Sequence, residues 1–522
     1  MITSNRVPRR AIVLLAATGL VFAACSSGKS ALDSGSDESS APTQPADSVD
    51  EDADGSDTSE PDSDTADSTT PESPAGPTTT VASLAELPPC PTEALDDATD
   101  PIDITFWHGM SSDNETALIA LTDAYNAGQD KVRVDLQNQT SYDSAVDKYI
   151  SASSNSRPTL IQLPDYTLQE FADSGTVVPA SACIDSSGFD TSPFLPRALG
   201  AYTLEGVLWG MPFNVSNPVL YFNRQMFEAA GLDPDDPPIT LDELRAASQQ
   251  LVDSGAAGTG IVLDSGPDSG GGWFLEQWFG RAGELYADNG NGRLARATQV
   301  LYDNDLGVEL LTFMQDMIND GLAVSIGDNA GGQDSFLKLV DKESAGAMAI
   351  GTSAALATVI QALGGGIAPG LTSDDFGVGP MPGPGEIPAV QVGGASLWIV
   401  ADKSDEQTAA AWDFITYMTE AQTQSTWAAS TGYVPVRNDA TELDPLAATY
   451  AADPRFRVAY DQVLSGSDDI TANAPALGPL RAVRAETARA VAAIFGGSDV
   501  QTSLSEAADA SDDLIVSYNE RN

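Results

Sequence analysis

The sequence predicts an α/β protein with at least two lobes, each built on a mainly parallel sheet flanked by helices. With 522 residues, the chain exceeds what one hydrophobic core usually supports. From residue 101 onward, strand-like runs alternate with amphipathic helical runs, and this alternation favours parallel sheets covered on both faces. A hydrophobic content of 42% and a charged content of 19% fit a globular protein.

The first α/β region is expected to follow the order β-α-β-α-β. The spacing of Leu118, Leu121 and Tyr125 is typical of one apolar helix face, and the apolar runs on either side are typical of strands. The expected elements are strands over 102–107, 132–136 and 159–163 and helices over 113–127 and 141–153.

The second α/β region contains clear helix starts. Thr240 and Glu243 have the spacing of a capping box, in which each side chain bonds to the backbone of the other residue. Another helix is expected to start at Ser404. The expected elements are helices over 240–253, 307–319, 404–418, 483–495 and 500–518 and strands over 376–380 and 395–401.

Residues 1–25 have the pattern of a lipoprotein signal peptide. Basic residues, among them Arg9 and Arg10, precede an apolar run over 11–22 that is too short to span a bilayer permanently. The run ends at Cys25 in a sequence that resembles a bacterial lipobox, so we expect lipidation of Cys25. Two points stay open: whether this is a plain secreted protein with an incidental cysteine, and whether Arg9-Arg10 direct twin-arginine export.

Residues 26–80 are expected to form a disordered acidic tether. They contain 14 acidic residues and one basic residue, Lys29, and too little apolar surface to offset the entropy of ordering. The whole chain carries −52, and subtracting +3 for the signal and −13 for the tether leaves −42 on residues 81–522. This charge excludes a nucleic-acid partner. It also means that any anionic ligand must be held by local donors.

The histidine and cysteine content limits the chemistry that is available. One histidine, His108, and three cysteines exclude the usual zinc spacings and any serine or cysteine dyad that does not use His108. We therefore predict no metal site and no cofactor. Outside the cytoplasm, Cys90 and Cys183 are expected to form a disulfide, with two buried thiols as the alternative.

A polar interruption within an apolar stretch is the first sign of a function. Residues 214–217, Asn-Val-Ser-Asn, break a strand-like run that resumes over 218–222. With four other strings, this segment resembles the family 1 extracellular solute-binding proteins of ATP-binding-cassette importers, and within them the glycerol-3-phosphate-binding subfamily. The resemblance covers about 101–520. The strings are 106–110 (FWHGM), 212–223 (PFNVSNPVLYFN), 230–234 (AGLDP), 393–398 (GGASLW) and 431–436 (TGYVPV).

The resemblance implies a two-lobed, periplasmic-binding-protein-like fold of the Venus flytrap type. The stretch 210–223 is expected to be the first crossing between the lobes, with the polar residues 214–217 at the floor of the cleft, where they would meet the ligand. A second crossing is expected just before Gly393 and Gly394. These glycines would let a ligand approach the backbone closely, and a β-bulge is their alternative role. The expected lobes are 81–217 plus 390–455 for lobe 1 and 218–389 plus 456–522 for lobe 2.

By the same resemblance, nine residues are expected to contact a ligand between the lobes. Arg484 matches a phosphate-binding arginine and is expected to open a helix, where a guanidinium and a helix N-terminus together suit an oxyanion. An exposed arginine paired with Glu486 is the alternative. Asp165 is alternatively a turn residue, and Tyr142 and Tyr433 are alternatively packed aromatics. The nine are Tyr142, Asp165, Ser216, Leu241, Thr352, Ser353, Gly394, Tyr433 and Arg484.

Two positions depart from the pattern of the subfamily. Asp165 stands where the subfamily usually has Glu, and Leu241 stands where it has Trp, so both changes would enlarge the cleft. We therefore expect a glycerophosphodiester such as glycerophosphocholine, or else sn-glycerol-3-phosphate. A choline group favours an aromatic face, for which Trp209, Trp273 and Trp278 are candidates.

The predicted function is that of the lipid-anchored substrate-binding component of an importer. We expect a monomer at the outer face of the bacterial cytoplasmic membrane that closes on its ligand and delivers it to transmembrane permease subunits. A binder of oligosaccharides on the same fold is the nearest alternative. An envelope hydrolase is disfavoured because the chain has no G-x-S-x-G or H-E-x-x-H motif, and a purely structural surface protein would bind no ligand.

Overall fold

A computed structural model describes most of the chain that follows the acidic segment. The expected signal peptide (1–25), the expected lipidation site Cys25 and the expected tether (26–80) lie outside the described residues. Among the residues that are described, no helix is both long enough and apolar enough to cross a membrane. The described ranges are 87–96, 98–329, 333–340, 345–368, 370–387, 389–466 and 469–522.

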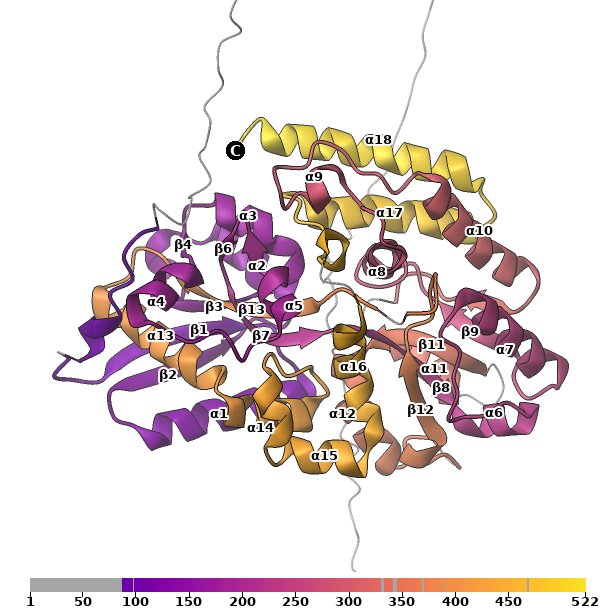
Figure 1. The fold of residues 1–522 in the computed structure, drawn as a ribbon, viewed down its shortest axis with the longest axis horizontal. Helices are drawn as coiled ribbons and strands as arrows, with labels where there is room; N and C mark the ends of the chain where they lie inside the picture. Colours follow the sequence, from indigo (N-terminus) through magenta and orange to yellow (C-terminus); the bar gives the residue numbers. More distant parts are fainter. Residues whose placement is uncertain are drawn as a thin grey trace, which may run out of the picture. The chain divides into compact units, whose positions relative to one another are not determined.

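Lobe 1 is built on a sheet that has six strands in the described part of the chain (Figure 1). The strands lie in the order β2-β1-β3-β13-β4, and β7 also pairs with β13. β1 runs parallel to β2 and β3, whereas β13 runs antiparallel to β3, β4 and β7. The strands are β1 (Ile102–His108), β2 (Val132–Asn138), β3 (Leu160–Pro164), β4 (Val177–Val178), β7 (Met211–Ser216) and β13 (Gly393–Val400).

Lobe 2 is built on a second sheet, with five strands among the described residues, in the order β10-β9-β11-β8-β12. β9 runs parallel to β10 and β11, and β8 runs antiparallel to β11 and β12. The strands are β8 (Pro218–Asn223), β9 (Thr259–Leu263), β10 (Ala323–Ser325), β11 (Gly346–Thr352) and β12 (Phe376–Pro380).

The predicted two-lobed α/β class is confirmed, but both sheets are mixed rather than mainly parallel. Every antiparallel pair in the two sheets includes β8 or β13, the strands through which the chain enters lobe 2 and returns to lobe 1. The chain leaves lobe 1 along β7, continues in lobe 2 as β8 and returns to lobe 1 as β13. Because the chain goes out on β7 and comes back on its neighbour β13, these two strands must be antiparallel, and the alternation of strands and helices in the sequence does not reveal this.

Helices pack on both faces of the lobe 1 sheet. Phe106 of β1 contacts Phe414 of α13, with ring centroids 6.0 Å apart, and Phe171 of α3 contacts Trp398 of β13 on the other side of the core. A short ladder of β5 (Thr203–Leu204) and β6 (Val207–Leu208) lies beside α5. The helices are α1 (Ser112–Gly128), α2 (Tyr142–Ser151), α3 (Leu168–Asp173), α4 (Ala180–Ser187), α5 (Pro196–Ala201), α13 (Asp405–Met418) and α14 (Ala421–Thr431).

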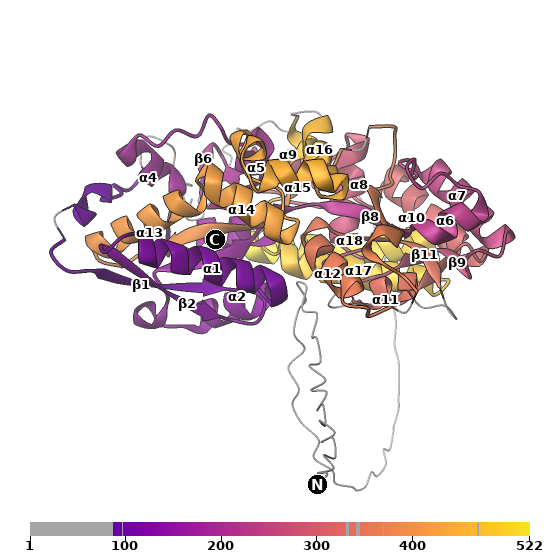
Figure 2. The same cartoon turned by 90° about the horizontal axis from the view of Figure 1, so that it is seen from below.

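Lobe 2 is covered in the same way, and a helical segment leads into it from α14 (Figures 1 and 2). That segment contains α15 (Leu446–Ala452) and α16 (Val458–Ser465). The other helices are α6 (Arg224–Ala230), α7 (Leu241–Asp253), α8 (Trp273–Ala282), α9 (Asp288–Asn291), α10 (Asp305–Asn319), α11 (Gln333–Val340), α12 (Leu356–Gly364), α17 (Leu480–Phe495) and α18 (Val500–Asn519).

The predicted elements all lie within three residues of observed ones, because their ends carry local signals. Thr240 and Glu243 form the predicted capping box at the start of α7, and Ser404 caps α13.

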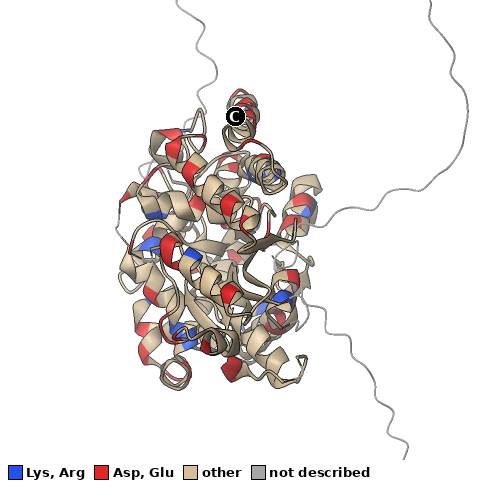
Figure 3. Cartoon of the chain, turned by 90° about the vertical axis from the view of Figure 1, so that its right-hand side faces the viewer, with Lys and Arg blue, Asp and Glu red and all other residues tan. Residues whose placement is uncertain are grey.

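The predicted disulfide is also confirmed, since Cys90 and Cys183 are bonded and both are buried. It ties the segment that enters lobe 1 to α4. Figure 3 colours more ribbon positions as acidic than as basic, in line with the negative charge of the sequence.

Candidate ligand-binding site

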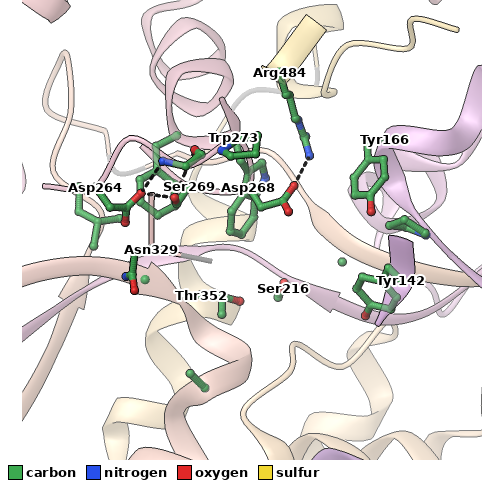
Figure 4. A pocket seen from close by; sticks show the side chains of 18 of the residues that line it. Tyr142, Tyr166, Ser216, Asp264, Asp268, Ser269, Trp273, Asn329, Thr352 and Arg484 are labelled. Carbon is green, nitrogen blue, oxygen red and sulfur yellow. Dashed lines mark hydrogen bonds and ion pairs between the residues drawn. The ribbon is translucent and has the colours of Figure 1, made fainter. Parts of the chain in front are cut away.

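A pocket with a cavity volume of about 120 Å³ lies between the two lobes. Figure 4 shows Tyr142 and Tyr166 on one side of it and Asp264, Ser269 and Trp273 on the other. The pocket brings together seven of the nine residues that were expected to contact a ligand. They are Tyr142, Asp165, Ser216, Thr352, Gly394, Tyr433 and Arg484.

The pocket forms where strands end and helices begin. Asp165 directly follows β3, and Thr352 is the last residue of β11. Tyr142 is the first residue of α2, whose start is fixed by Ser141, because the Ser141 hydroxyl accepts the N–H of Ser144. Ends of strands and starts of helices present free backbone groups, which is why ligands commonly bind there.

Arg484 is buried in the pocket wall, in a position that differs from the expected one. Because α17 begins at Leu480, Arg484 lies in the second turn and not at the tip of the helix. Its side chain is 3% exposed. It does not pair with Glu486, which instead forms an ion pair with Arg489. The guanidinium itself, and not the helix N-terminus, is therefore the group that faces the pocket.

Carboxylates surround the Arg484 guanidinium. Nε and Nη2 each donate to one oxygen of Glu276 at 2.7 Å, and the Glu276 side chain is fully buried. Asp165 Oδ2 lies 3.5 Å from Nη2, and Asp268 Oδ1 lies 3.8 Å from Nη1. The Tyr166 ring lies under the guanidinium carbon, with its centroid at 5.2 Å.

This clustering shifts the pKa values of the groups in the pocket. Burial raises the pKa of Asp165 to about 6, although Arg484 opposes the rise. Burial likewise raises the pKa of Asp268 to about 7, again against the effect of Arg484. Burial alone would lower the pKa of Arg484, but Glu276 and the two aspartates hold it above its ordinary value. The guanidinium thus stays charged while two neighbouring carboxyls titrate near neutral pH.

Two buried polar atoms of the pocket wall, Asp165 Oδ2 and Trp273 Nε1, have no hydrogen-bond partner among the described residues. Buried polar atoms in folded proteins are nearly always hydrogen-bonded. An unsatisfied acceptor and an unsatisfied donor on one pocket therefore fit a ligand that carries both kinds of group.

Of the three tryptophans considered for an aromatic face, Trp273 alone is among the described residues that line the pocket. It is the first residue of α8. Trp278, five residues further along α8, donates its indole N–H to the Pro382 carbonyl at 2.9 Å. Trp209 packs in the core of lobe 1.

Tyrosine hydroxyls line the lobe 1 side of the pocket. The hydroxyl oxygens of Tyr142 and Tyr433 are 3.5 Å apart. The Asn214 amide donates to the Tyr142 hydroxyl at 2.7 Å and accepts from Gln162 at 2.8 Å. The Tyr433 ring stacks on Trp427, with ring centroids 5.4 Å apart. Both hydroxyls are therefore held in place by lobe 1.

The polar residues of the first crossing mostly serve the protein itself, which corrects the expectation that they all face a ligand. Asn214 and Asn217 are fully buried. Asn217 donates to the Ala459 carbonyl at 2.8 Å and accepts from Gln462 at 3.0 Å. Of this group, Ser216 lines the pocket.

Two of the nine expected residues, Leu241 and Ser353, are not placed in the pocket. Leu241 is the first residue of α7, and the Thr240 capping box orients it so that it packs against the core of lobe 2. Ser353 is buried at the crossing, where its N–H donates to the Asn217 carbonyl at 2.9 Å and its hydroxyl accepts the Asn217 N–H at 3.4 Å.

The loop between β9 and α8 lines the pocket but was not predicted to do so. Asp264 accepts the Gly270 N–H at 3.0 Å and the Ser269 hydroxyl, and this bonding shapes a turn that brings Asp268 to the pocket. A usable signal was present in the sequence. Polar residues directly follow a buried strand here, as they do at Asp165.

The lining favours a polar ligand with hydroxyl groups. Arg484 is the one cation among the described lining residues, against five aspartates, and aromatic side chains from both lobes complete the wall. His108, the one histidine in the sequence, is buried in β1 and is not among the described residues that line the pocket. The aspartates are Asp143, Asp165, Asp264, Asp268 and Asp328.

Known proteins resemble the chain over most of its length. The sequence profile of a family described as bacterial extracellular solute-binding protein matches residues 120–458. The sn-glycerol-3-phosphate-binding periplasmic protein UgpB of Yersinia pestis is 27% identical over 373 residues, which are 70% of this chain and 80% of the relative.

Two solved structures share the fold at low sequence identity. UgpB of Mycobacterium tuberculosis, in complex with glycerophosphocholine, has a TM-score of 0.65 at 22% identity and covers 81% of this chain and 100% of its own. The sugar-binding protein MalE of Xanthomonas citri has a TM-score of 0.66 at 19% identity and covers 80% of this chain and 98% of its own.

Proposed function

This chain belongs to the bacterial extracellular solute-binding proteins, and from that premise we propose that it captures a glycerophosphodiester, such as glycerophosphocholine, or sn-glycerol-3-phosphate. Members of the family are exported substrate-binding components of ABC importers and pass small ligands to permease subunits. The choice of a phosphate-bearing ligand is supported by the ligands named for the relatives. It is also supported by one feature of the pocket.

That feature is the buried guanidinium of Arg484. Two of its nitrogens bond Glu276 at 2.7 Å, whereas the one carboxylate within ion-pair distance of Nη1 among the described residues is Asp268, at 3.8 Å. A guanidinium edge in a pocket lined by both lobes suits a phosphate oxygen. Trp273 and Tyr166 would offer ring faces to a choline group.

The proposed mechanism is ligand-stabilised closure of the lobes. Lobe 1 would contribute Tyr142, Asp165 and Tyr433, and lobe 2 would contribute Thr352 and Arg484. A ligand that touches both sets at once binds the closed form better than the open form, and this difference in affinity is what shifts the equilibrium. The ligand is held and released without chemical change. Gly394 and Ser216 would contact it at the crossings.

Location and assembly follow from the same proposal. Lipidation of Cys25 would anchor the chain at the outer face of the bacterial cytoplasmic membrane, with residues 26–80 as the tether. The globular part would act as a monomer and dock on its permease when closed.

A neutral sugar is the second candidate, and the carboxylates of the pocket favour it. Glu276 already neutralises Arg484, and Asp165 and Asp268 offer acceptors to hydroxyl groups. Such a ligand would not need the guanidinium edge. The two candidates therefore differ in their dependence on Arg484.

Calorimetric titration of three compounds tests the proposal: glycerophosphocholine, sn-glycerol-3-phosphate and maltotriose. We expect Arg484→Lys, which keeps the charge and loses the planar fork, to weaken diester binding at least tenfold. Arg489→Ala is the control because that side chain is 71% exposed. Maltotriose binding that survives Arg484→Lys, with no diester binding by the wild type, would refute the phosphate assignment.

A further inference from the structure

Asp268 occupies the part of the pocket that an anionic ligand would have to enter. It lies in the loop between β9 and α8, and its side chain is 35% exposed within the pocket. Figure 4 shows the carboxylate next to the Arg484 guanidinium, and Oδ1 lies 3.8 Å from Nη1. Nη1 is the nitrogen that Glu276 leaves unbonded. A phosphate oxygen that approaches Nη1 therefore meets the Asp268 carboxylate.

The surroundings make this encounter repulsive when Asp268 is ionised. One guanidinium is shared by three carboxylates, Glu276, Asp165 and Asp268, at 2.7, 3.5 and 3.8 Å. Asp143 adds a fourth carboxylate on the lobe 1 side, where it accepts the Tyr166 hydroxyl at 2.7 Å and forms an ion pair with Arg481 at 3.6 Å. The charged and titratable groups that face Asp268 are Arg484 of α17, Glu276 of α8, Asp165 and Tyr166 after β3, and Asp143 of α2.

We infer that Asp268 couples capture of an anionic ligand to uptake of one proton from solvent. When ionised, the carboxylate competes with the ligand phosphate for Arg484 Nη1 and repels it. When protonated, it is a neutral hydroxyl donor that hydrogen-bonds a phosphate oxygen beside the guanidinium. This inference rests on the proposed function, and it makes Asp268 a specificity-determining residue of the site.

The direction of the pH dependence follows from linkage. The pKa of Asp268 in the ligand-free protein is about 7, chiefly because of burial, and a bound phosphate would raise it further because the two negative charges repel. Affinity for the anion therefore increases as the pH falls through 7 and is lost as the pH rises above it. Between pH 6 and pH 8 a single carboxyl of this kind changes the affinity roughly tenfold.

Calorimetric titration of the wild type with glycerophosphocholine at pH 6, 7 and 8 tests the inference. A phosphodiester keeps one charge over this range, so the ligand itself contributes no protons. Repeating the titration at pH 8 in two buffers of different ionisation enthalpy counts the protons taken up. We expect about one proton per ligand through Asp268, and an affinity at pH 6 roughly tenfold higher than at pH 8.

Asp268→Asn mimics the protonated carboxyl at every pH, because the amide is uncharged, has a similar shape and is a permanent donor. We expect this variant to bind the diester at pH 8 about as tightly as the wild type does at pH 6, with proton uptake lower by about one. Asp235→Asn, at a side chain that is 79% exposed, should behave as the wild type does.

Equal proton uptake and equal pH dependence in the wild type and in Asp268→Asn would overturn the inference and leave the proposed function standing. Absence of diester binding by the wild type at all three pH values would overturn the proposed function, and the inference with it. The two failures are therefore distinguishable in one set of titrations.

Discussion

Two carboxylates next to one arginine have different roles. Glu276 is fully buried and bonds Arg484 through two hydrogen bonds of 2.7 Å. A buried ion pair compensates for the lost hydration of its partners only while both partners are present. Asp268 is further away, at 3.8 Å, and more exposed. Glu276 therefore supports the fold, whereas Asp268 is positioned to respond to a ligand.

The role of Glu276 leads to a prediction about stability. Glu276→Gln would leave the Arg484 guanidinium buried with only the more distant Asp165 and Asp268 to compensate it. We expect the free energy of unfolding of the ligand-free protein to fall by about 3 kcal/mol, measured by urea denaturation at pH 8. Glu228→Gln, on the exposed side of α6, should change it by less than about 0.5 kcal/mol. Equal effects of the two substitutions would contradict this account.

Residues of the site were predictable where the local string around them resembles that of the family. Asp165 directly after β3 and Tyr142 at the start of α2 occupy positions that a reader of the sequence can identify. The partner of Arg484 was not predictable, because Glu276 lies 208 positions away and no periodicity connects the two. Leu241 was expected in the pocket but packs against the core of lobe 2. A capping box shows where a helix starts, but not which neighbouring elements the first residue will contact.

Elements were predictable to the extent that their own sequence specifies them. The capping box of α7 and the apolar spacing of α1 gave boundaries that agree with the structure within a few residues. Strand direction was not predictable. The antiparallel pairing of β13 with β3 and β7 depends on the path of the chain between the lobes, and a strand has the same period of two in either direction.

The start of β13 is sensitive to substitution at Gly394. Gly394 has a φ of +98°, which side chains rarely adopt, and an added Cβ would collide with the Asn214 carbonyl oxygen. The register of β13 on β7 also shifts between Ala395 and Ser396. The glycine therefore permits a close approach of β7 and β13. The β-bulge that was the alternative role of the glycines corresponds to the register shift, which follows Gly394.

Gly394→Ala tests this close approach, and Gly497 offers a matched control. Gly497 has a similar φ of +97°, but nothing lies within 4 Å of its added Cβ. We expect Gly497→Ala to lower the free energy of unfolding by about 1 kcal/mol, the cost of the backbone conformation alone. Gly394→Ala should cost roughly 3 kcal/mol or more, as measured by urea denaturation. Similar losses in both variants would show that the contact with Asn214 is unimportant.

The two lobes also contact each other away from the pocket. Arg296 of lobe 2 donates to both carboxylate oxygens of Asp173 in α3 of lobe 1, at 2.8 and 2.6 Å. The Tyr518 hydroxyl of α18 donates to the same carboxylate at 2.9 Å. Arg293 donates to the Gly200 and Thr203 carbonyls at 2.8 and 2.9 Å. In these contacts lobe 2 provides the donors and lobe 1 the acceptors.

If these contacts form only when the lobes are closed, they contribute to ligand affinity without touching the ligand. We expect Asp173→Asn to reduce the affinity for glycerophosphocholine about fivefold, the equivalent of roughly 1 kcal/mol for a charge-assisted contact, and to enlarge the radius of gyration of the ligand-free protein in X-ray scattering. Asp461→Asn removes the ion pair between Asp461 of α16 and Arg457, which directly precedes α16, and the two side chains are 55% and 54% exposed. It should change neither quantity. Unchanged affinity in Asp173→Asn would mean that the contacts persist in the open form.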